Sequence, residues 1–348
     1  MSTDSSSCQT IQLGPYTLPN RVFVAPMAGV TDRPFRKLCR RLGAGYAVSE
    51  MVTSRRDLWD SLKTSRRADH AGEPGPIAVQ IAGTDAAMMA QAAAYNIDRG
   101  AQIIDINMGC PAKKVCKQWA GSALMRNEAL ALDIAQAVVR TCEPRGVPVT
   151  LKMRTGWSEG ERNAVSLARQ FEATGVRMLT VHGRTREQGY RGQAEYETIA
   201  AVKAAVRLPV VANGDITSPR KAQRVLHATG ADAVMIGRAA QGRPWLLGEM
   251  AHYLATGQAL APLPMSQVRA LLLEHLDEHY SLYGDATGVR SARKHIAWYV
   301  QGLPQAKEFC ARMNSLETTT QQVQCVAQYL DQISGQMNHL PQPFDNYE

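Results

Sequence analysis

Short hydrophobic runs rich in Val and Ile recur along the first 240 residues of the chain. There are eight of them, at residues 21–29, 46–51, 76–83, 103–109, 149–156, 178–184, 210–216 and 233–239. Their hydrophobicity is nearly continuous rather than alternating, which is typical of strands buried on both faces. The pattern therefore predicts eight parallel strands.

Amphipathic stretches with a helical period separate these runs. Residues 84–99 are rich in Ala and Met and end at Gly100, a residue that commonly stops helices. Residues 217–229 open with Thr217 and Ser218, both suitable N-caps. Strands thus alternate with helices along this part of the chain.

Eight strand–helix units within about 240 residues match the size of a TIM barrel. We therefore expect a (β/α)8 TIM barrel over residues 11–250. A doubly wound sheet is the alternative, but its first strand should be followed by the phosphate loop G-x-G-x-x-G. The corresponding stretch "APMAGVTDRP" lacks that loop.

The pattern becomes purely helical after "APLP" at residues 261–264. It predicts helices at residues 266–284, 291–300 and 317–334, the first of them capped by Ser266. We expect a small all-helical domain over residues 263–336. Residues 1–10 and 337–348 are expected to be a disordered N-terminal tail and a frayed C-terminal tail.

The net charge of +8 is unevenly distributed. Residues 1–250 hold 33 Lys and Arg against 22 Asp and Glu, whereas residues 251–348 hold 6 against 9. Many of the cations fall in two short stretches: Arg33, Arg36, Lys37, Arg40 and Arg41, then Arg55, Arg56, Lys63, Arg66 and Arg67. Such faces are often merely solvated, but the excess also suits a phosphate-rich partner.

Composition excludes several classes of protein. No run of about 18 apolar residues is present, so we expect no membrane span, and "MSTDSSSCQT" does not resemble a signal peptide. Seven scattered cysteines indicate a reducing cytoplasm. Cys110 and Cys116 are too far apart for Cys-x-x-Cys spacing and no second pair follows, so no metal site is expected.

Polar or small residues end every hydrophobic run. They are Met27 to Gly29, Glu50, Gln80, Asn107 with Cys110, Lys152 with Arg154, His182 with Arg184, Asn213 with Asp215, and Gly237 with Arg238. The carboxyl ends of barrel strands meet at one mouth, where catalytic groups lie. Eight such ends predict a lined pocket.

The last two runs carry a phosphate signal. "ANGDI" and "MIGRAA" each place a glycine where a strand turns into a helix, and freed backbone amides there can bind an anion. Arg238 can add a charged donor. In TIM barrels the loops after strands seven and eight often bind phosphate.

Lys152 ends an otherwise apolar strand, where a buried ammonium needs a partner or a function. It could be a Schiff-base amine or a fixed cation beside a developing anion. The first reading gives Cys110 and Gln80 no role. A flavin would give each residue a place, with Gln80 at the ring edge and Lys152 beside the charge of the reduced ring.

The motifs point to one family. "APMAGVTDRPFR", "VQIAG", "INMGCPAKKV", "LKMRTGW", "HGRTREQGYR", "ANGDI" and "MIGRAAQGRPW" occur in this order, and "ARKHIAWY" follows in the helical part. From about residue 11 to residue 335 the sequence resembles the tRNA-dihydrouridine synthases, and most of all their bacterial B subgroup. These flavoenzymes reduce uridine in the D-loop of tRNA.

The resemblance implies FMN as cofactor and NADPH, or NADH, as reductant. It implies a cofactor site formed by Pro26, Met27, Ala28, Gln80, Lys152, His182, Asn213, Gly214, Asp215, Gly237 and Arg238. The residues implied to face the nucleotide are Asn107, Arg154, Arg184 and Tyr190. It further implies a cytoplasmic monomer, and position 17 as the uridine that is reduced.

Cys110 matches the general acid of the family. Reduction of uracil needs hydride at C6, from flavin N5, and a proton at C5. A thiol with a pKa near 8.5 is mostly protonated at neutral pH and can give that proton. Lys113 and Lys114 would favour the thiolate, so we expect them to face RNA phosphate instead.

A uridine within folded tRNA has to be flipped out to reach the bottom of a barrel mouth. The helical domain is then explained as a second wall that grips the tRNA. Arg290, Arg293 and Lys294 fall at helical spacing on one face and are its expected contacts.

Two other functions compete with this one. A flavin barrel acting on a free small molecule, as in dihydroorotate dehydrogenases, gives no reason for the helical domain or for the basic barrel. An RNA-binding protein built on an inactive barrel gives no reason for Cys110 and Lys152.

Overall fold

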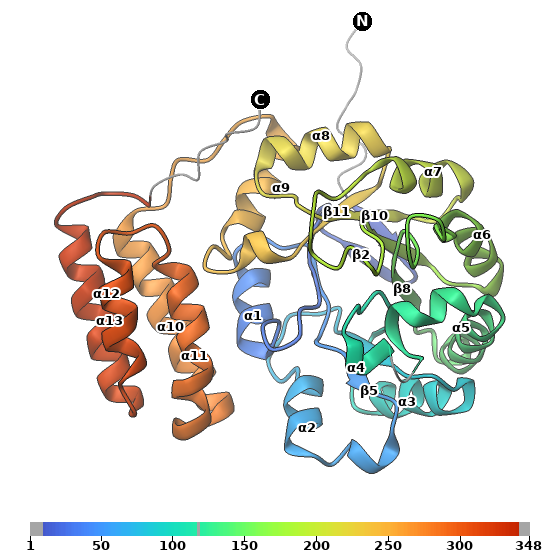
Figure 1. Ribbon diagram of the computed structural model, residues 1–348, viewed down its shortest axis with the longest axis horizontal. Coiled ribbons are helices and arrows are strands. Elements are labelled where there is room, and N and C mark those ends of the chain that lie inside the picture. The colour runs from blue at the N-terminus through green and yellow to red at the C-terminus, as the bar shows by residue number, and fades with distance from the viewer. Residues whose placement is uncertain (1–9, 117–118, 341–348) are drawn as a thin grey trace, which may run out of the picture.

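Parallel strands form a barrel in the computed structural model, which describes residues 10–116 and 119–340. The strands are β3 (Val22–Val24), β4 (Tyr46–Ala47), β5 (Val52–Thr53), β6 (Ala78–Ala82), β7 (Ile103–Met108), β8 (Val149–Arg154), β9 (Met178–His182), β10 (Val210–Asn213) and β11 (Ala233–Ile236). Hydrogen-bonded neighbours follow the order β4-β3-β11-β10-β9-β8-β7-β6-β5. Together with the helices, this order confirms the predicted TIM-barrel fold (Figure 1).

The second predicted strand, at residues 46–51, begins with β4, and a separate short strand, β5, starts at Val52, just after the predicted end. β4 pairs with β3, and β5 pairs with β6. Between them, Val48 forms a parallel bridge with Ala78, and the Ser49 amide donates to the Ala78 carbonyl at 3.0 Å. β4 and β5 therefore act together as one strand that closes the ring.

Helices lie outside the strands (Figure 1). They are α1 (Arg33–Arg41), α2 (Leu62–Ala68), α3 (Ala86–Asp98), α5 (Glu128–Cys142), α6 (Ala164–Thr174), α7 (Glu197–Ala205), α8 (Pro219–Thr229) and α9 (Leu246–Thr256), with the short α4 (Lys113–Cys116) after β7. The N-cap of α8 is Ser218, whose hydroxyl accepts from the Lys221 amide at 3.2 Å. Of the two predicted caps, Ser218 is therefore the one used.

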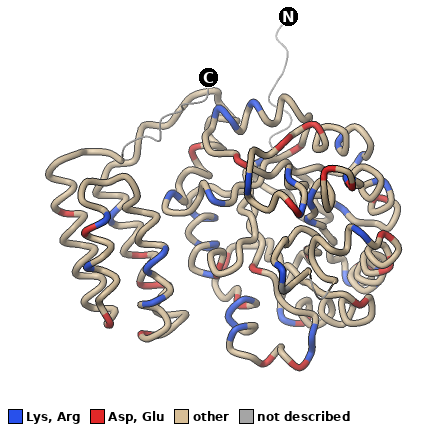
Figure 2. Tube along the Cα trace, viewed as in Figure 1, with Lys and Arg blue, Asp and Glu red and all other residues tan. Residues whose placement is uncertain are grey.

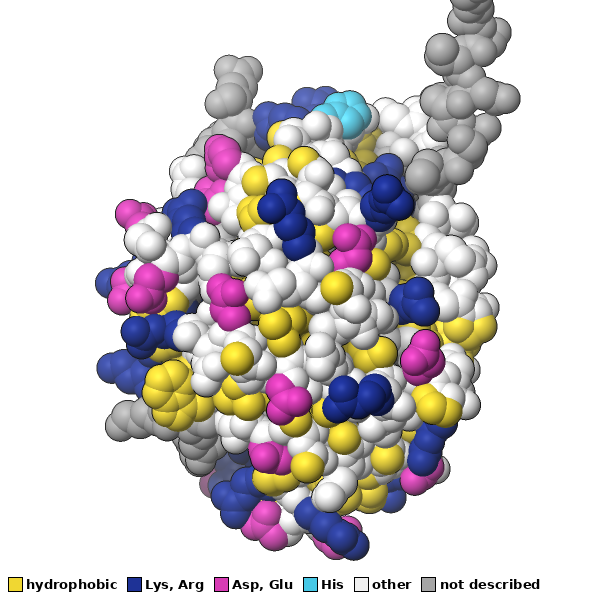
Figure 3. Space-filling view, turned by 90° about the vertical axis from the view of Figure 1, so that its right-hand side faces the viewer, with side chains coloured by type: hydrophobic (Ala, Val, Ile, Leu, Met, Phe, Trp, Pro, Cys, Tyr) yellow, Lys and Arg dark blue, Asp and Glu magenta, His cyan; other side chains and the backbone are white. Residues whose placement is uncertain are grey.

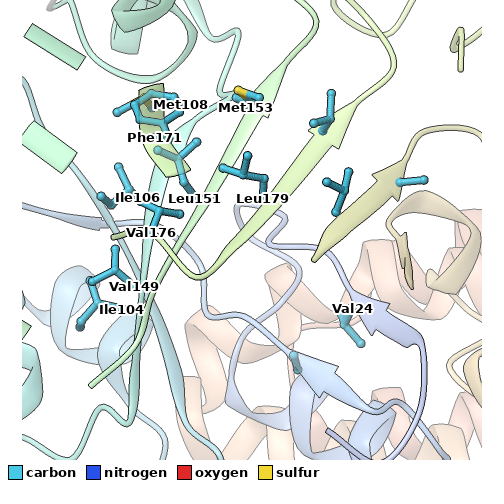
Figure 4. Close-up of a cluster of buried hydrophobic side chains, with 14 of the residues drawn as sticks. Val24, Ile104, Ile106, Met108, Val149, Leu151, Met153, Phe171, Val176 and Leu179 are labelled. Carbon is cyan, nitrogen blue, oxygen red and sulfur yellow. The ribbon is translucent and has the colours of Figure 1, made fainter. Parts of the chain in front are cut away.

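Side chains on the barrel strands alternate between two environments. Ile104, Ile106 and Met108 of β7 pack with Leu151 of β8 in the cluster that Figure 4 shows. The alternate residues of β7 face the barrel interior instead, and they change from Ile103 to polar residues along the strand. Because all six β7 residues are buried, the sequence looked uniformly buried although only one face is fully apolar.

A hairpin precedes the barrel and was not predicted. It consists of β1 (Ile11–Leu13) and β2 (Tyr16–Leu18), paired antiparallel. Its apolar side chains pack against inward-facing residues at the starts of the strands, such as Phe23, Ile103 and Met178. The hairpin thus covers the N-terminal end of the barrel and leaves the strand carboxyl ends as the place for a site.

The C-terminal part contains four helices rather than the three predicted. They are α10 (Met265–Tyr283), α11 (Asp285–Tyr299), α12 (Ala306–Asn314) and α13 (Thr319–Ser334). They share an apolar core that Trp245 from the barrel joins. The N-cap of α10 is Pro264, so the prediction of Ser266 as its cap was wrong.

Most of the two predicted tails, residues 1–9 and 341–348, lies outside the described residues. Within the described part, Met337 and Leu340 pack against the core of the helical domain, and the Asn338 carbonyl accepts from the Met265 amide at 2.9 Å.

The helical domain lies beside α1 (Figure 1). Ion pairs across this interface join Lys37 to Glu278 at 2.7 Å and Arg41 to Glu274 at 2.6 Å. Within the barrel, the buried Arg36 pairs with Glu73. Much of the basic cluster on α1 is therefore paired with acidic residues of the same chain. The sequence analysis considered a solvated helix face or a phosphate-rich partner, and it did not anticipate these ion pairs.

Charge elsewhere is more evenly mixed. On the barrel side away from the helical domain, the described Lys and Arg side chains are interspersed with Asp and Glu (Figure 3). Basic positions are more concentrated along α2 and α11 (Figure 2). None of the described helices is long and apolar enough to cross a membrane.

Two glycines with the same backbone geometry test how closely α11 is held. Gly242 has φ +72°, and a Cβ there would lie 2.4 Å from the Trp298 carbonyl; Gly257 has φ +71° and open space. We predict that Gly257→Ala lowers the free energy of unfolding by about 1 kcal/mol through backbone strain. Gly242→Ala should cost roughly 1–3 kcal/mol more, because it forces α11 off the barrel. Urea unfolding followed by circular dichroism measures both, and equal losses would contradict the close approach.

Candidate active site

A cavity of about 770 Å³ opens at the carboxyl ends of the barrel strands. Its lining includes every residue expected to bind the cofactor: Pro26, Met27, Ala28, Gln80, Lys152, His182, Asn213, Gly214, Asp215, Gly237 and Arg238. It also includes Asn107, Cys110, Arg154 and Tyr190. Its volume is within the range of small-molecule and cofactor sites.

A buried carboxylate lies beneath this cavity. Oδ1 of Asp105 accepts from the Thr150 hydroxyl at 2.6 Å, and Oδ2 accepts from Gln80 Nε2 at 2.7 Å. Burial raises the pKa of Asp105, although the bonds from Thr150 and Gln80 and the nearby Lys152 work against that rise. Because both oxygens accept hydrogen bonds from donors, the site is built around the ionised form.

The hydrogen bonds continue from Gln80 to the turn that carries Cys110. Asn107 Nδ2 donates to Gln80 Oε1 at 2.7 Å, and Asn107 Oδ1 accepts from the Cys110 amide at 3.0 Å. On the other side, the Ser122 hydroxyl donates to the Cys110 carbonyl at 2.9 Å. The backbone of Cys110 is therefore fixed by two side chains.

The thiol of Cys110 is half-buried at the cavity wall. Burial raises its pKa above the usual range, while the nearby Arg154 and Lys152 act in the opposite direction. Cys110 is therefore protonated at neutral pH. A thiol in this state can donate a proton to a group in the cavity.

Lys152 brings a cation into the floor of the cavity. Its Nζ donates to Asn213 Oδ1 at 2.9 Å, and Asn213 Nδ2 in turn donates to the Met235 carbonyl at 2.8 Å. Burial is the main cause that lowers the pKa of Lys152 to about 8, and Arg154 adds to it. The ammonium is thus held by one amide and stays available to a bound anion.

The turn after β10 exposes its backbone to the cavity. Gly214 has φ +129°, and a Cβ there would lie 2.7 Å from Ala194 Cβ, so only glycine fits. The Asp215 side chain binds the guanidinium groups of Arg184 and Arg238. Both oxygens of Asp215 are therefore engaged by guanidinium groups, and Arg238 is held beside the cavity.

Tyr190 lies at the mouth and is 60% exposed. The guanidinium carbons of Arg154 and Arg238 are 5.7 and 5.2 Å from the centre of its ring. Arg154 is itself buried, and its guanidinium group is satisfied there: Nε donates to the Gly109 carbonyl at 2.7 Å and Nη1 to the Gly189 carbonyl at 2.9 Å. It thereby ties the Cys110 turn to the Tyr190 loop.

His182 lies between these cations. Burial, together with Lys152, Arg154 and other cations, holds the pKa of His182 far below its usual value. The ring is therefore neutral and can donate or accept a hydrogen bond without adding charge to the cavity.

Arg184 and Lys113 are not part of the cavity lining. Arg184 is only 1% exposed and is bound to Asp215 and to the Gly192 carbonyl. Lys113 is exposed on α4. The side chain of Lys114 lies outside the described residues.

The three basic residues expected to form one tRNA-binding face are used differently. Arg290 is exposed, whereas Arg293 donates to the Leu316 carbonyl at 3.2 Å within the helical domain. Lys294 donates to the Gly29 carbonyl in the barrel. Of the three, Arg290 remains as the exposed cation.

Sequence reasoning missed the supporting residues Asp105 and Thr150. Both belong to the inward-facing set, at positions 105, 107, 150, 152 and 154, and their polar character inside apolar runs was the available signal. Met51 and Gln241 also line the cavity. Nothing in their local sequence distinguishes them.

Comparison with known proteins gives the family. Residues 23–334 match the family model for dihydrouridine synthase. The chain is 59% identical to tRNA-dihydrouridine synthase B of Pseudomonas aeruginosa over 319 residues, covering 92% of this chain and 95% of that protein. It is 58% identical to the protein of the same name from Xanthomonas campestris pv. campestris, covering 92% and 96%.

Solved structures with a similar fold are more distant. Histamine dehydrogenase from Rhizobium sp. 4-9 aligns with a TM-score of 0.56 and 12% identity, covering 95% of this chain and 65% of that one. An old yellow enzyme homologue from Zymomonas mobilis aligns with a TM-score of 0.50 and 15% identity, covering 72% and 93%. These two likenesses support the fold alone. The family model and the relatives together show that the chain belongs to the dihydrouridine synthase family, within its B subgroup.

Proposed function

We propose that the protein reduces a uridine of the tRNA D-loop, at position 17, to 5,6-dihydrouridine with FMN as its flavin and NADPH as electron donor. The reaction class, flavin-dependent reduction of uridine in tRNA, follows from the family. The observation that supports a site for flavin-dependent reduction of uracil is the cavity, which brings a thiol, a buried ammonium and an exposed aromatic ring to one mouth. We further propose that it acts as a cytoplasmic monomer.

The cavity residues fit a flavin. Gly214 and Gly237 leave backbone accessible beneath the place where a phosphate would bind, and Arg238 is half-exposed beside them. Lys152 can stabilise negative charge on a ring laid against Pro26 and Met27. A bound flavin would supply the hydride, from its reduced ring to C6 of the uracil.

The chain itself supplies the proton. Cys110 lies after β7, whereas the proposed phosphate seat follows β10 and β11 on another part of the mouth. A uracil between them would have the thiol on one face and the hydride source on the other. The fixed turn and the raised pKa keep a proton on Sγ until C5 accepts it.

The ribose and phosphates of the flipped nucleotide would meet the exposed groups around the mouth. Tyr190, held by two guanidinium groups, offers an aromatic face for stacking. Exposed Lys113 and Arg290 are suited to the backbone. This arrangement explains why the base must leave the tRNA stack.

The first test removes the proposed acid. Cys110→Ala should leave flavin reduction by NADPH unchanged, because no uracil takes part in that half-reaction. Anaerobic reoxidation of the flavin by tRNA should slow by roughly a hundredfold to ten-thousandfold. The control is Cys116→Ala, which removes the thiol 3.5 Å from the Cys110 carbonyl and should stay within a few-fold of wild type. Reoxidation of the Cys110 variant at a near-native rate would exclude the role.

The second test uses the titration of Lys152. Its cation is present below pH 8 and is lost as the pH rises through about 8, so flavin reduction by NADPH should slow above that pH. Lys152→Met should be slow at every pH, and Lys152→Arg should retain the rate at high pH because guanidinium stays charged. Stopped-flow absorbance measures the rate of flavin reduction from about pH 6 to about pH 10, roughly two pH units on either side of this pKa. An unaltered profile in Lys152→Met would rule the role out.

The third test concerns the tRNA backbone. Arg290→Gln and Lys113→Gln should each weaken binding to all tRNAs alike. Each should reduce the slope of log affinity against log salt by roughly 0.7–0.9, the loss of one phosphate contact. Lys307→Gln on α12, farther from the barrel, is the control (Figure 1). Unchanged affinity in the first two variants would place the tRNA elsewhere.

A further inference from the structure

Four buried groups meet where the helical domain contacts the barrel. Asp32 is the N-cap of α1, His275 and His279 lie one turn apart on α10, and His295 lies on α11. Each is at most 2% exposed. They belong to neither the cavity nor the reaction proposed above.

Several polar atoms of this cluster lack a hydrogen-bond partner. They are both ring nitrogens of His275, Nδ1 of His279, Nε2 of His295 and Oδ2 of Asp32. Buried polar atoms are normally satisfied, so a cluster of this kind calls for an explanation. One explanation is a ligand that all of them share.

The hydrogen bonds around His279 sharpen the point. The Ser291 hydroxyl lies 2.8 Å from the Thr287 carbonyl and 2.7 Å from His279 Nε2, and its single proton can be donated to only one of them. When that proton goes to Thr287 and His279 Nε2 carries the ring proton, Nδ1 presents a bare lone pair 3.4 Å from Oδ2 of Asp32. In that tautomer two acceptors face each other, and a cation between them would satisfy both.

The distances suit a metal ion. One ring nitrogen from each histidine lies within 4.8 Å of the others. Tetrahedral Zn²⁺ with bonds of about 2.0–2.1 Å needs ligand nitrogens about 3.4 Å apart, so small ring movements suffice. The His275 and His295 rings meet at 73° rather than stacking, as converging ligands do.

A route from solvent is present. A second cavity, of about 330 Å³, lies between α1 and α10 and reaches His275. Glu274 and Glu278 line it, each paired with a cation of α1.

We propose that Asp32, His275, His279 and His295 form a zinc site that fastens the helical domain to the barrel. The three imidazoles lie close enough together to share one ion, and the Asp32 carboxylate, 3.4 Å from His279 Nδ1, would complete the four ligands of a closed, structural zinc site. The hydrogen bond between Ser291 and Nε2 of His279 would orient the ring, as a hydrogen bond to the other ring nitrogen of a metal-bound histidine usually does. The sequence analysis expected no metal because it considered cysteine spacing alone, whereas the signal was His-x-x-x-His at 275–279.

The test measures metal on the full chain, purified without a polyhistidine tag. Elemental analysis should find one zinc per chain. After chelation, one equivalent of Co²⁺ should give the visible absorption of a tetrahedral site, without the sulfur charge-transfer band that cysteine ligands produce. Zinc should also raise the melting temperature of the chelated protein.

Variants assign the site. His275→Gln and His295→Gln should each weaken Co²⁺ binding by more than roughly a hundredfold, whereas His227→Gln, exposed on α8, should bind as wild type does. Wild-type protein that retains no metal after equilibration with zinc and desalting overturns the proposal. Binding that survives in the two cluster variants also overturns it. The wild-type measurement stands even if those variants fail to fold.

Discussion

The arrangement of the cavity depends on one buried carboxylate. Asp105 points into the barrel, where its charge has to be satisfied without water, and Thr150 and Gln80 do this from the two neighbouring strands. Orienting Gln80 in this way orients Asn107, and Asn107 shapes the turn at Cys110. A group that never reaches the substrate thus sets the position of the thiol.

Charged residues are also paired with one another at the domain interface. Lys37 and Arg41 look like surface cations in the sequence, yet they pair with Glu278 and Glu274 of α10. Lys294 reaches back to the loop after the first strand, next to Met27 and Ala28 of the cavity. The helical domain therefore contacts the cavity wall, and these three cations are used within the protein.

Much of this could be predicted from the sequence, for identifiable reasons. The barrel followed from the spacing of apolar runs, and most of the cavity lining followed from the polar residues that end those runs, although Glu50 and Arg184 are not part of it. That β4 ends at Ala47 and a separate β5 starts at Val52 could not be predicted, since residues 46–51 read as one apolar run. Partners of charged residues were also out of reach: Arg36 finds Glu73 thirty-seven positions away, and Arg184 finds Asp215 only through the tertiary fold.

The hairpin at the start of the chain has a consequence for the order of events. Its side chains fill the N-terminal end of the barrel, so the described cavity opens at the opposite end. Under the proposed function, the electron donor and the tRNA would both reach the cofactor from this open end. Two reactants too large to occupy that opening together would bind in turn, so release of the first would precede binding of the second. The six strand residues of the β1–β2 hairpin, at the opposite end of the barrel, would in this way favour sequential binding of the reactants.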